Sequence, residues 1–211
     1  MHSMDQRSAE WFAARVGKAT ASKIGDIVAK TKSGYSTSRA NYAAQLVRER
    51  LLGMPEETFS NAAMMWGTEK EPEAREAYQR HALCSVVEVG FVDHPTIEMS
   101  GASPDGLVGH DGLVEIKCPT PATHQETLLG GSVPKKYLTQ IHWQMACTGR
   151  AWCDFVSYDP RWPDEMQLFV QRVERDEELI AELEREVAAF LKEVDETVAA
   201  LRERYTMKEA A

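Results

Sequence analysis

Apolar residues along this chain recur at two spacings, and the alternation between them predicts a mixed fold. Steps of three and four residues are typical of amphipathic helices, and they cover residues 8–16, 37–52, 60–81 and 134–149. A further helix is expected within residues 119–131, and one long helix with an apolar stripe follows Asp176. Short runs rich in β-branched and aromatic residues predict strands over residues 84–92, 113–117, 151–158 and 166–173. We therefore expect an α/β fold, a central mixed β-sheet flanked by helices, with a long C-terminal helix.

Several of the predicted helices carry capping signals at their ends. Ser8 is the expected N-cap of the first helix and Gly17 ends it, while Asp176 is the expected N-cap of the last. Thr20 or Ser22 is expected to cap a second helix through its hydroxyl. The apolar stripe of the last helix is expected to pack on the domain, with an oligomer seam as the alternative.

Composition is that of an ordinary globular protein. With 211 residues, 43% hydrophobic and 27% charged, we expect a single domain over residues 1–211. The four cysteines form no C-x-x-C pair, and the chain begins without an apolar leader, so reduced thiols in a cytoplasmic protein are expected. No run of about 18 apolar residues is present, so no membrane span is expected.

The charge balance limits how this chain can bind nucleic acid. Lys and Arg number 24 against 33 Asp and Glu, a formal net charge of −9, which argues against a protein that coats nucleic acid non-specifically. A local DNA contact is expected in the first quarter of the chain, which concentrates basic residues: Arg15, Lys18, Lys23, Lys30, Lys32, Arg39 and Arg48.

The most informative stretch runs from residue 103 to residue 117. Turn residues between two short apolar runs predict a β-hairpin, in which Glu115 and Lys117 share one face while Val114 and Ile116 point into the core. Asp105, at the start of the hairpin, is expected to reach the face of Glu115. Two carboxylates and an ammonium at one point favour a bound cation or phosphate, and Mg²⁺ prefers such oxygen ligands.

Each of these residues also has a purely structural interpretation. Asp105 can be a turn aspartate, with Glu115 and Lys117 an exposed pair on an edge strand. Glu71 and Arg75 are spaced as a surface ion pair on a helix. The glutamines at 140 and 144 share one side of their helix and, from the pattern alone, are solvent-exposed residues.

In their order and approximate spacing, the motifs resemble the lambda-exonuclease (YqaJ-type) group of phage recombination nucleases, within the restriction-endonuclease-like PD-(D/E)xK superfamily. The resemblance covers nearly all of the chain. It rests on Trp11 to Arg15 with Thr20-Ala21-Ser22, Trp66-Gly67 with Glu71, Ser103-Pro104-Asp105-Gly106-Leu107, Glu115-Ile116-Lys117-Cys118-Pro119, Leu129-Gly130-Gly131, Tyr137 with Gln140, Ala151-Trp152 and Tyr158-Asp159-Pro160-Arg161.

The resemblance implies roles for individual residues. Asp105, Glu115 and the backbone carbonyl of Ile116 correspond to metal ligands, and Lys117 to the lysine that orients or deprotonates the attacking water. Glu71 corresponds to a supporting catalytic carboxylate. The residues that correspond to those holding a terminal 5′-phosphate are Arg15, Ser22, Ser103 and Gln140. The resemblance gives His142 and Gln144 no role, and it leaves open whether Asp93 corresponds to a further acidic residue near the second metal.

The resemblance also implies an activity and partners. The expected enzyme is a 5′→3′ exonuclease of the alkaline exonuclease type that uses Mg²⁺, with Mn²⁺ as a substitute and two ions per active site. It degrades double-stranded DNA from 5′-phosphorylated ends and leaves 3′ single-stranded overhangs for single-strand annealing recombination. A ring-shaped homotrimer and a single-strand annealing protein partner are implied. The alternatives are an endonuclease or single-strand nuclease of the same superfamily, a catalytically silent protein that binds DNA ends, and a glycosidase-like carboxylate pair.

Overall fold

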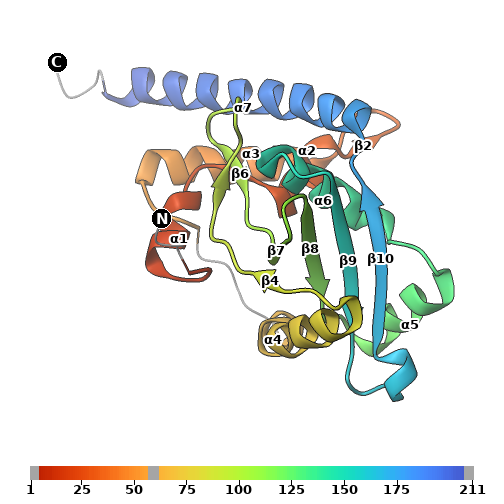
Figure 1. Cartoon of the computed structure of the whole chain (residues 1–211). Helices are drawn as coiled ribbons and strands as arrows, with labels where there is room; N and C mark the ends of the chain where they lie inside the picture. Colours follow the sequence, from red (N-terminus) through yellow and green to blue (C-terminus); the bar gives the residue numbers. More distant parts are fainter. Residues whose placement is uncertain (1–4, 57–61, 207–211) are drawn as a thin grey trace.

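The computed structural model describes residues 5–56 and 62–206 (Figure 1). Its helices are α1 (Ala9–Arg15), α2 (Ile24–Val28), α3 (Thr37–Leu52), α4 (Ala62–Ala82), α5 (Pro121–Gly130), α6 (Lys135–Thr148) and α7 (Glu177–Thr206), with the 3₁₀ helices η1 (Ala21–Lys23) and η2 (Asp164–Met166). Its strands are β1 (Ala19–Thr20), β2 (Lys30–Thr31), β3 (Gly34–Tyr35), β4 (Val86–Val87), β5 (Val92–Asp93), β6 (Ser100–Ala102), β7 (Gly106–Val108), β8 (Gly112–Lys117), β9 (Trp152–Tyr158) and β10 (Leu168–Glu174). The α/β fold with a long C-terminal helix is confirmed.

The central sheet is mixed, as predicted. Its strand order is β10-β9-β8-β7-β4, in which β8 and β9 are parallel and the other neighbours are antiparallel. A parallel pair needs a crossover connection, and α5 and α6 lie within the segment that joins β8 to β9. A smaller sheet of order β1-β6-β5 and the hairpin β2-β3 lie outside this sheet.

Helices cover both faces of β8. Val114 and Ile116 belong to an apolar cluster with Tyr78 of α4. Leu113 belongs to another, with Ile141 of α6. Because successive side chains of a strand point to opposite faces, the odd-numbered residues of β8 face α6 and the even-numbered ones face α4. A charged residue at position 115 is therefore held inside the protein.

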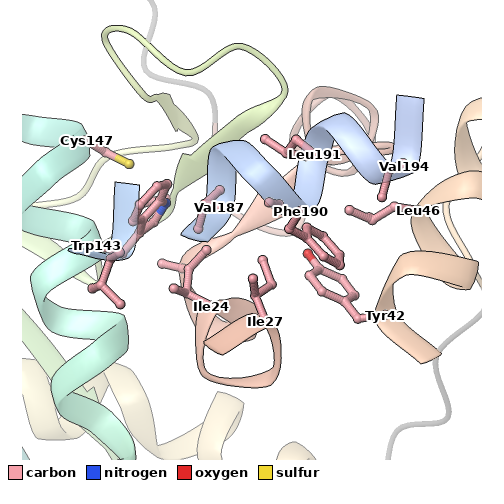
Figure 2. Close-up of a cluster of buried hydrophobic side chains, with 14 of the residues drawn as sticks. Ile24, Ile27, Tyr42, Leu46, Trp143, Cys147, Val187, Phe190, Leu191 and Val194 are labelled. Carbon is pink, nitrogen blue, oxygen red and sulfur yellow. The ribbon is translucent and has the colours of Figure 1, made fainter. Parts of the chain in front are cut away.

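The long helix α7 packs along one side of the domain. In Figure 1 it runs along the top of the molecule, with α4 at the bottom. Its apolar stripe meets α2, α3 and α6, as Figure 2 shows for Val187 and Phe190. Phe190 is fully buried and stacks on Tyr42 of α3, with ring centroids 5.6 Å apart. The prediction that this stripe packs on the domain is confirmed.

The predicted caps at the two ends of the chain are confirmed, but the one between them is wrong. The Ser8 side chain accepts a hydrogen bond from the Trp11 backbone N–H, and the Asp176 carboxylate accepts from the Leu179 backbone N–H. Thr20 precedes η1 without a side-chain capping bond, and Ser22 lies inside η1. Thr20 is the last residue of the two-residue strand β1, and its backbone N–H donates to the Tyr42 hydroxyl.

A single strand over residues 84–92 is also not observed. The segment contributes the two-residue strands β4 and β5, which belong to different sheets. The β-branched residues favour extended backbone, but they do not determine which neighbour each part pairs with. All four cysteines, Cys84, Cys118, Cys147 and Cys153, are free thiols. Among residues 5–56 and 62–206, no helix combines the length and apolar character needed to cross a membrane.

Candidate active site

The β7-β8 hairpin brings Asp105, Glu115 and Lys117 together. Asp105 directly precedes β7, and its Oδ2 accepts a hydrogen bond from the Ile116 backbone N–H at 2.7 Å. Lys117 Nζ forms an ion pair with Glu115 Oε1. Glu115 is fully buried, and β8 lies between β7 and β9. The edge-strand interpretation of this pair is therefore wrong, and the predicted convergence of three charged groups is observed.

Burial and neighbouring charges shift the pKa values of Asp105 and Lys117. Burial, and then the negative charge of Glu115, raise the pKa of Asp105 well above its ordinary value. The charge of Glu71 acts in the same direction. Burial disfavours the charged form of Lys117, yet the carboxylates of Glu115 and Asp105 outweigh it and raise the pKa of the lysine. Two acids crowded beside one ammonium leave unbalanced negative charge, which is what a cation would neutralise.

Two glutamines of α6 hold the Glu115 carboxylate. Gln140 Nε2 donates to Glu115 Oε1 at 2.5 Å, and Gln144 Nε2 donates to Oε2 at 2.6 Å. Gln144 is fully buried and Gln140 is partly buried, so the interpretation of the two residues as solvent-exposed is wrong. Their spacing of four residues indicated a shared helix face. What the pattern could not indicate is that this face lies on β8.

A second cluster, next to the first in sequence, is built around Ser103. Its hydroxyl oxygen accepts hydrogen bonds from Trp11 Nε1 at 2.9 Å and from Arg15 Nη1 at 3.2 Å. The Arg15 guanidinium also lies 4.0 Å from the centroid of the Trp11 ring. Because Trp11 and Arg15 are donors only, the hydroxyl proton of Ser103 remains to be donated. The cluster therefore presents donors and a cation, which suits an anion.

The four residues expected to hold a phosphate are not all joined. Arg15 and Ser103 are in contact, whereas Gln140 is bonded to Glu115. Ser22 is exposed, and among the described residues no hydrogen bond connects it to Arg15 or Ser103. Trp11 belongs to this cluster, although no separate role was predicted for it. An indole beside an arginine one helical turn later is the signal that could have identified it.

Two further acidic residues have defined partners. Glu71 accepts from Arg75 at 2.8 Å, which confirms the predicted ion pair, and from Arg7 at 2.7 Å. Asp93 forms an ion pair with Lys18 at 2.5 Å. Glu71 therefore combines a structural ion pair with an electrostatic effect on the neighbouring Asp105.

Gln6 supports the site from the N-terminal segment. Its Nε2 donates to the carbonyls of Pro104 and Val89, each at 2.8 Å. These bonds hold the backbone between Ser103 and Asp105. No pattern in the sequence indicates this contact, because Gln6 and Pro104 are 98 positions apart.

Most basic side chains of the first quarter are engaged with acids. Arg15 is an exception, since no ion pair of Arg15 occurs within the described ranges, and burial lowers its pKa. A partly desolvated guanidinium without a carboxylate partner is available to an external anion. Five of the basic residues named in the sequence analysis form ion pairs: Lys18 with Asp93, Lys23 with Asp26, Lys30 with Glu186, Arg39 with Glu193 and Arg48 with Glu56.

The donor set beside Lys117 fits a hard divalent cation. In the part of the chain that the structure describes, no three His, Cys, Asp or Glu side chains form a metal-binding group. Mg²⁺ does not require three, because it commonly takes one or two carboxylates, keeps waters and binds substrate phosphates. Asp105 and Glu115 supply two carboxylates. The Ile116 carbonyl points to the same side of β8 as its N–H, which faces Asp105.

The chain is similar to known proteins over most of its length. The family model of the YqaJ-like viral recombinase domain matches residues 10–151. The crystal structure of an alkaline exonuclease (LHK-Exo) from Laribacter hongkongensis matches at 52% sequence identity with a TM-score of 0.89, over 95% of this chain and 99% of that chain. Its complex with dAMP matches equally well. A search of curated proteins gave no significant match.

A more distant structure shares the fold. The phage related exonuclease from Haemophilus somnus 129PT matches with a TM-score of 0.68 at 16% identity, over 87% of this chain and 96% of that chain. The family model spans more than half of the chain, and a 52% identical structure aligns along nearly all of it. The chain therefore belongs to the YqaJ-like viral recombinase domain family.

Proposed function

We propose that this protein is a metal-dependent 5′→3′ exonuclease that degrades double-stranded DNA from 5′-phosphorylated ends and leaves 3′ single-stranded overhangs for single-strand annealing recombination. The observation that carries the proposal is the convergence of Asp105, Glu115 and Lys117 at the end of the β7-β8 hairpin. Family membership and the similarity to an alkaline exonuclease support the same chemistry.

The cofactor we propose is Mg²⁺, with Mn²⁺ as a substitute and two ions per active site. Asp105, Glu115 and the Ile116 carbonyl would hold it, and Glu71 would add negative charge nearby. When bound, such ions neutralise charge on the phosphoryl oxygens and activate water. Lys117, kept as an ammonium by its acidic neighbours, would orient the attacking water and stabilise developing charge.

Hydrolysis adds water across a P–O3′ bond. The water oxygen bonds to phosphorus, the released 3′-oxygen takes up a proton, and a 5′-mononucleotide leaves. The shortened strand ends again in a 5′-phosphate. The crystal complex of the 52% identical LHK-Exo with dAMP supports a mononucleotide as the product class.

We propose that the cluster around Ser103 binds the terminal phosphate. Arg15 would supply charge and the free O–H of Ser103 a hydrogen bond. Ser22 would complete the group after local movement, together with the second N–H of the Gln140 amide, whose first N–H stays on Glu115. Such contacts carry no base information, so degradation would not depend on sequence. Each cleavage regenerates the group that this cluster holds, which suits stepwise removal of nucleotides.

The proposed assembly is a ring-shaped homotrimer with DNA in its centre, and the proposed partner is a single-strand annealing protein. A net charge of −9 opposes DNA binding to the whole surface. A ring reconciles this charge with the substrate, because basic groups can line the hole while acidic groups face outward. Sedimentation equilibrium measures the assembly mass directly.

Digestion of a linear duplex with and without 5′-phosphates tests the activity. We expect metal-dependent release of mononucleotides, faster from phosphorylated ends. Lys117→Ala should lower the rate at least 100-fold and leave binding of the duplex intact, because the lysine acts on the reacting water. Equal rates on both kinds of end would reject the phosphate role of Arg15 and Ser103 and leave the metal site standing.

A closed circular duplex separates the remaining candidates. An exonuclease requires an end, so cleavage of the circle would identify an endonuclease instead. A catalytically silent end-binding protein would bind the linear duplex and release no nucleotide with Mg²⁺ or Mn²⁺. The presence of Lys117 beside both carboxylates argues against that alternative and against a glycosidase-like pair.

A further inference from the structure

We propose that Gln144 is a positioning residue of this site, whose side-chain amide fixes the Glu115 carboxylate in the orientation that binds the divalent cation. The inference rests on the proposed function, because it assigns Glu115 to metal binding. Neither the sequence pattern nor the family resemblance gives Gln144 a role.

The contacts of Glu115 carry the first step. Gln140 donates to Oε1 and Gln144 to Oε2, at 2.5 and 2.6 Å. An ionised carboxylate only accepts hydrogen bonds, so both amides must present their NH₂ groups to it. One donor on each oxygen, from successive turns of α6, prevents the carboxylate from rotating about its terminal bond.

The second step is that core packing gives no reason for an amide at this position. Gln144 is fully buried, and its Oε1 has no hydrogen-bond partner among the described residues. A buried acceptor left unpaired destabilises the folded state. The neighbouring inward positions of α6, Ile141 and Met145, are apolar and pack without that penalty. The hydrogen bond to Glu115 is therefore what the amide contributes.

The third step concerns which carboxylate oxygen remains open. Oε1 accepts from both Gln140 and Lys117, whereas Oε2 accepts from Gln144 alone within the described part of the chain. A carboxylate oxygen has about two lone-pair positions, so Oε2 keeps one for a cation. Because the amide is neutral, it orients this oxygen without repelling a positive ion. A second lysine at this position would repel the ion.

Titration with Mn²⁺, followed by electron paramagnetic resonance, tests the inference without requiring turnover. We expect Gln144→Leu to weaken Mn²⁺ affinity by about 10- to 100-fold, the usual effect of removing a hydrogen-bond partner of a metal ligand. Binding of 5′-phosphorylated duplex in EDTA should stay within about twofold, and the maximal rate should recover at saturating Mn²⁺. Gln144→Met, which keeps the length of the side chain without its N–H groups, should behave in the same way.

Gln45→Leu is the matched control. Gln45 Nε2 donates to Glu49 Oε1 at 2.8 Å, so this change removes another glutamine–glutamate bond, on α3. It should leave Mn²⁺ affinity unchanged. Wild-type affinity in both Gln144 variants would overturn the inference, and so would failure of both to fold, which would assign the residue to stability. Absence of Mn²⁺ binding by the wild type would instead reject the proposed metal site itself.

Discussion

The two carboxylates of the site differ in how well their charge is compensated. Glu115 accepts hydrogen bonds from two amides and pairs with an ammonium. For Asp105, the structure gives one hydrogen bond, from the Ile116 backbone N–H, within the described ranges. The charge of Asp105 is therefore the less compensated of the two. Burial, and then the charge of Glu115, raise the pKa of Asp105 well above its ordinary value. Two carboxylates that repel each other in the absence of a cation are arranged for binding rather than for stability.

Asp105→Asn should therefore stabilise the metal-free protein while abolishing nucleotide release. The amide oxygen can keep the bond to Ile116, and the negative charge is lost. Because the pKa of Asp105 is raised in the folded state, this residue contributes its full stability below about pH 3.8, its pKa in the unfolded chain. That contribution is lost as the pH rises through its pKa in the folded protein. Above that range we expect the variant to be more stable by about 1 kcal/mol, roughly 2–4 °C in Tm.

Thermal unfolding in EDTA at several pH values measures this difference. The gap between variant and wild type should widen as pH rises from about 4, because the wild type alone loses stability there. Asp111→Asn, in the exposed turn between β7 and β8, should produce no such pH-dependent gap. A variant less stable than the wild type at neutral pH would show that the Asp105 charge is compensated.

At the scale of elements, α4 is joined to the sheet through a partly buried polar network. The Tyr78 hydroxyl donates to Asp154 Oδ2 at 2.7 Å, and the Arg172 guanidinium donates to both carboxylate oxygens. Strand β9 thus connects α4 on one face with β10 at its edge. This network holds Glu71, on the same helix, close to the metal-binding residues.

Tyr78→Phe should destabilise the protein by about 1–2 kcal/mol, because Asp154 loses a donor while the ring still packs. Denaturant unfolding monitored by circular dichroism measures the change. Tyr205→Phe, at an exposed position of α7, is the matched control and should have no measurable effect. An unchanged midpoint for Tyr78→Phe would mean that Arg172 alone satisfies the carboxylate.

Periodicity predicted most of the elements but few of their partners. The spacing of apolar residues located α3, α6, α7 and β9, since amphipathic patterns follow from local geometry. It failed over residues 84–92, where the chain leaves one sheet for another. Motif order located Asp105, Glu115 and Lys117, whereas Gln6 and Gln144 depend on contacts between distant segments. Such contacts are set by tertiary packing, which a single sequence does not encode as a local pattern.

At the scale of the whole molecule, α6 links the candidate active site on β8 to the apolar cluster beneath α7. Gln140 and Gln144 lie on the face of α6 toward β8, while Trp143 and Cys147 of the same helix pack against α7 and α2. Displacement of α7 would therefore disturb the residues that hold Glu115. This connection indicates that the site and the core unfold together.

The cysteines allow this connection to be measured. Cys147, Cys118 and Cys153 each lie in a different apolar cluster, and Cys84 is partly exposed. Burial is the main cause that raises the pKa of Cys118 to about 12, and it also raises the pKa of the other two buried thiols. In the native protein, alkylation at pH 8 should therefore modify Cys84 first and the others only after opening.

Pulse alkylation in increasing urea, read by mass spectrometry, then reports each cluster separately. If the described chain is one cooperative unit, the three buried thiols should become reactive at the same urea midpoint, because each requires global unfolding. Cys84 should react throughout and serves as the internal control. Reaction of Cys147 well before Cys118 and Cys153 would mean that α7 and its cluster separate from the sheet first, and the expectation of a single domain would then be wrong.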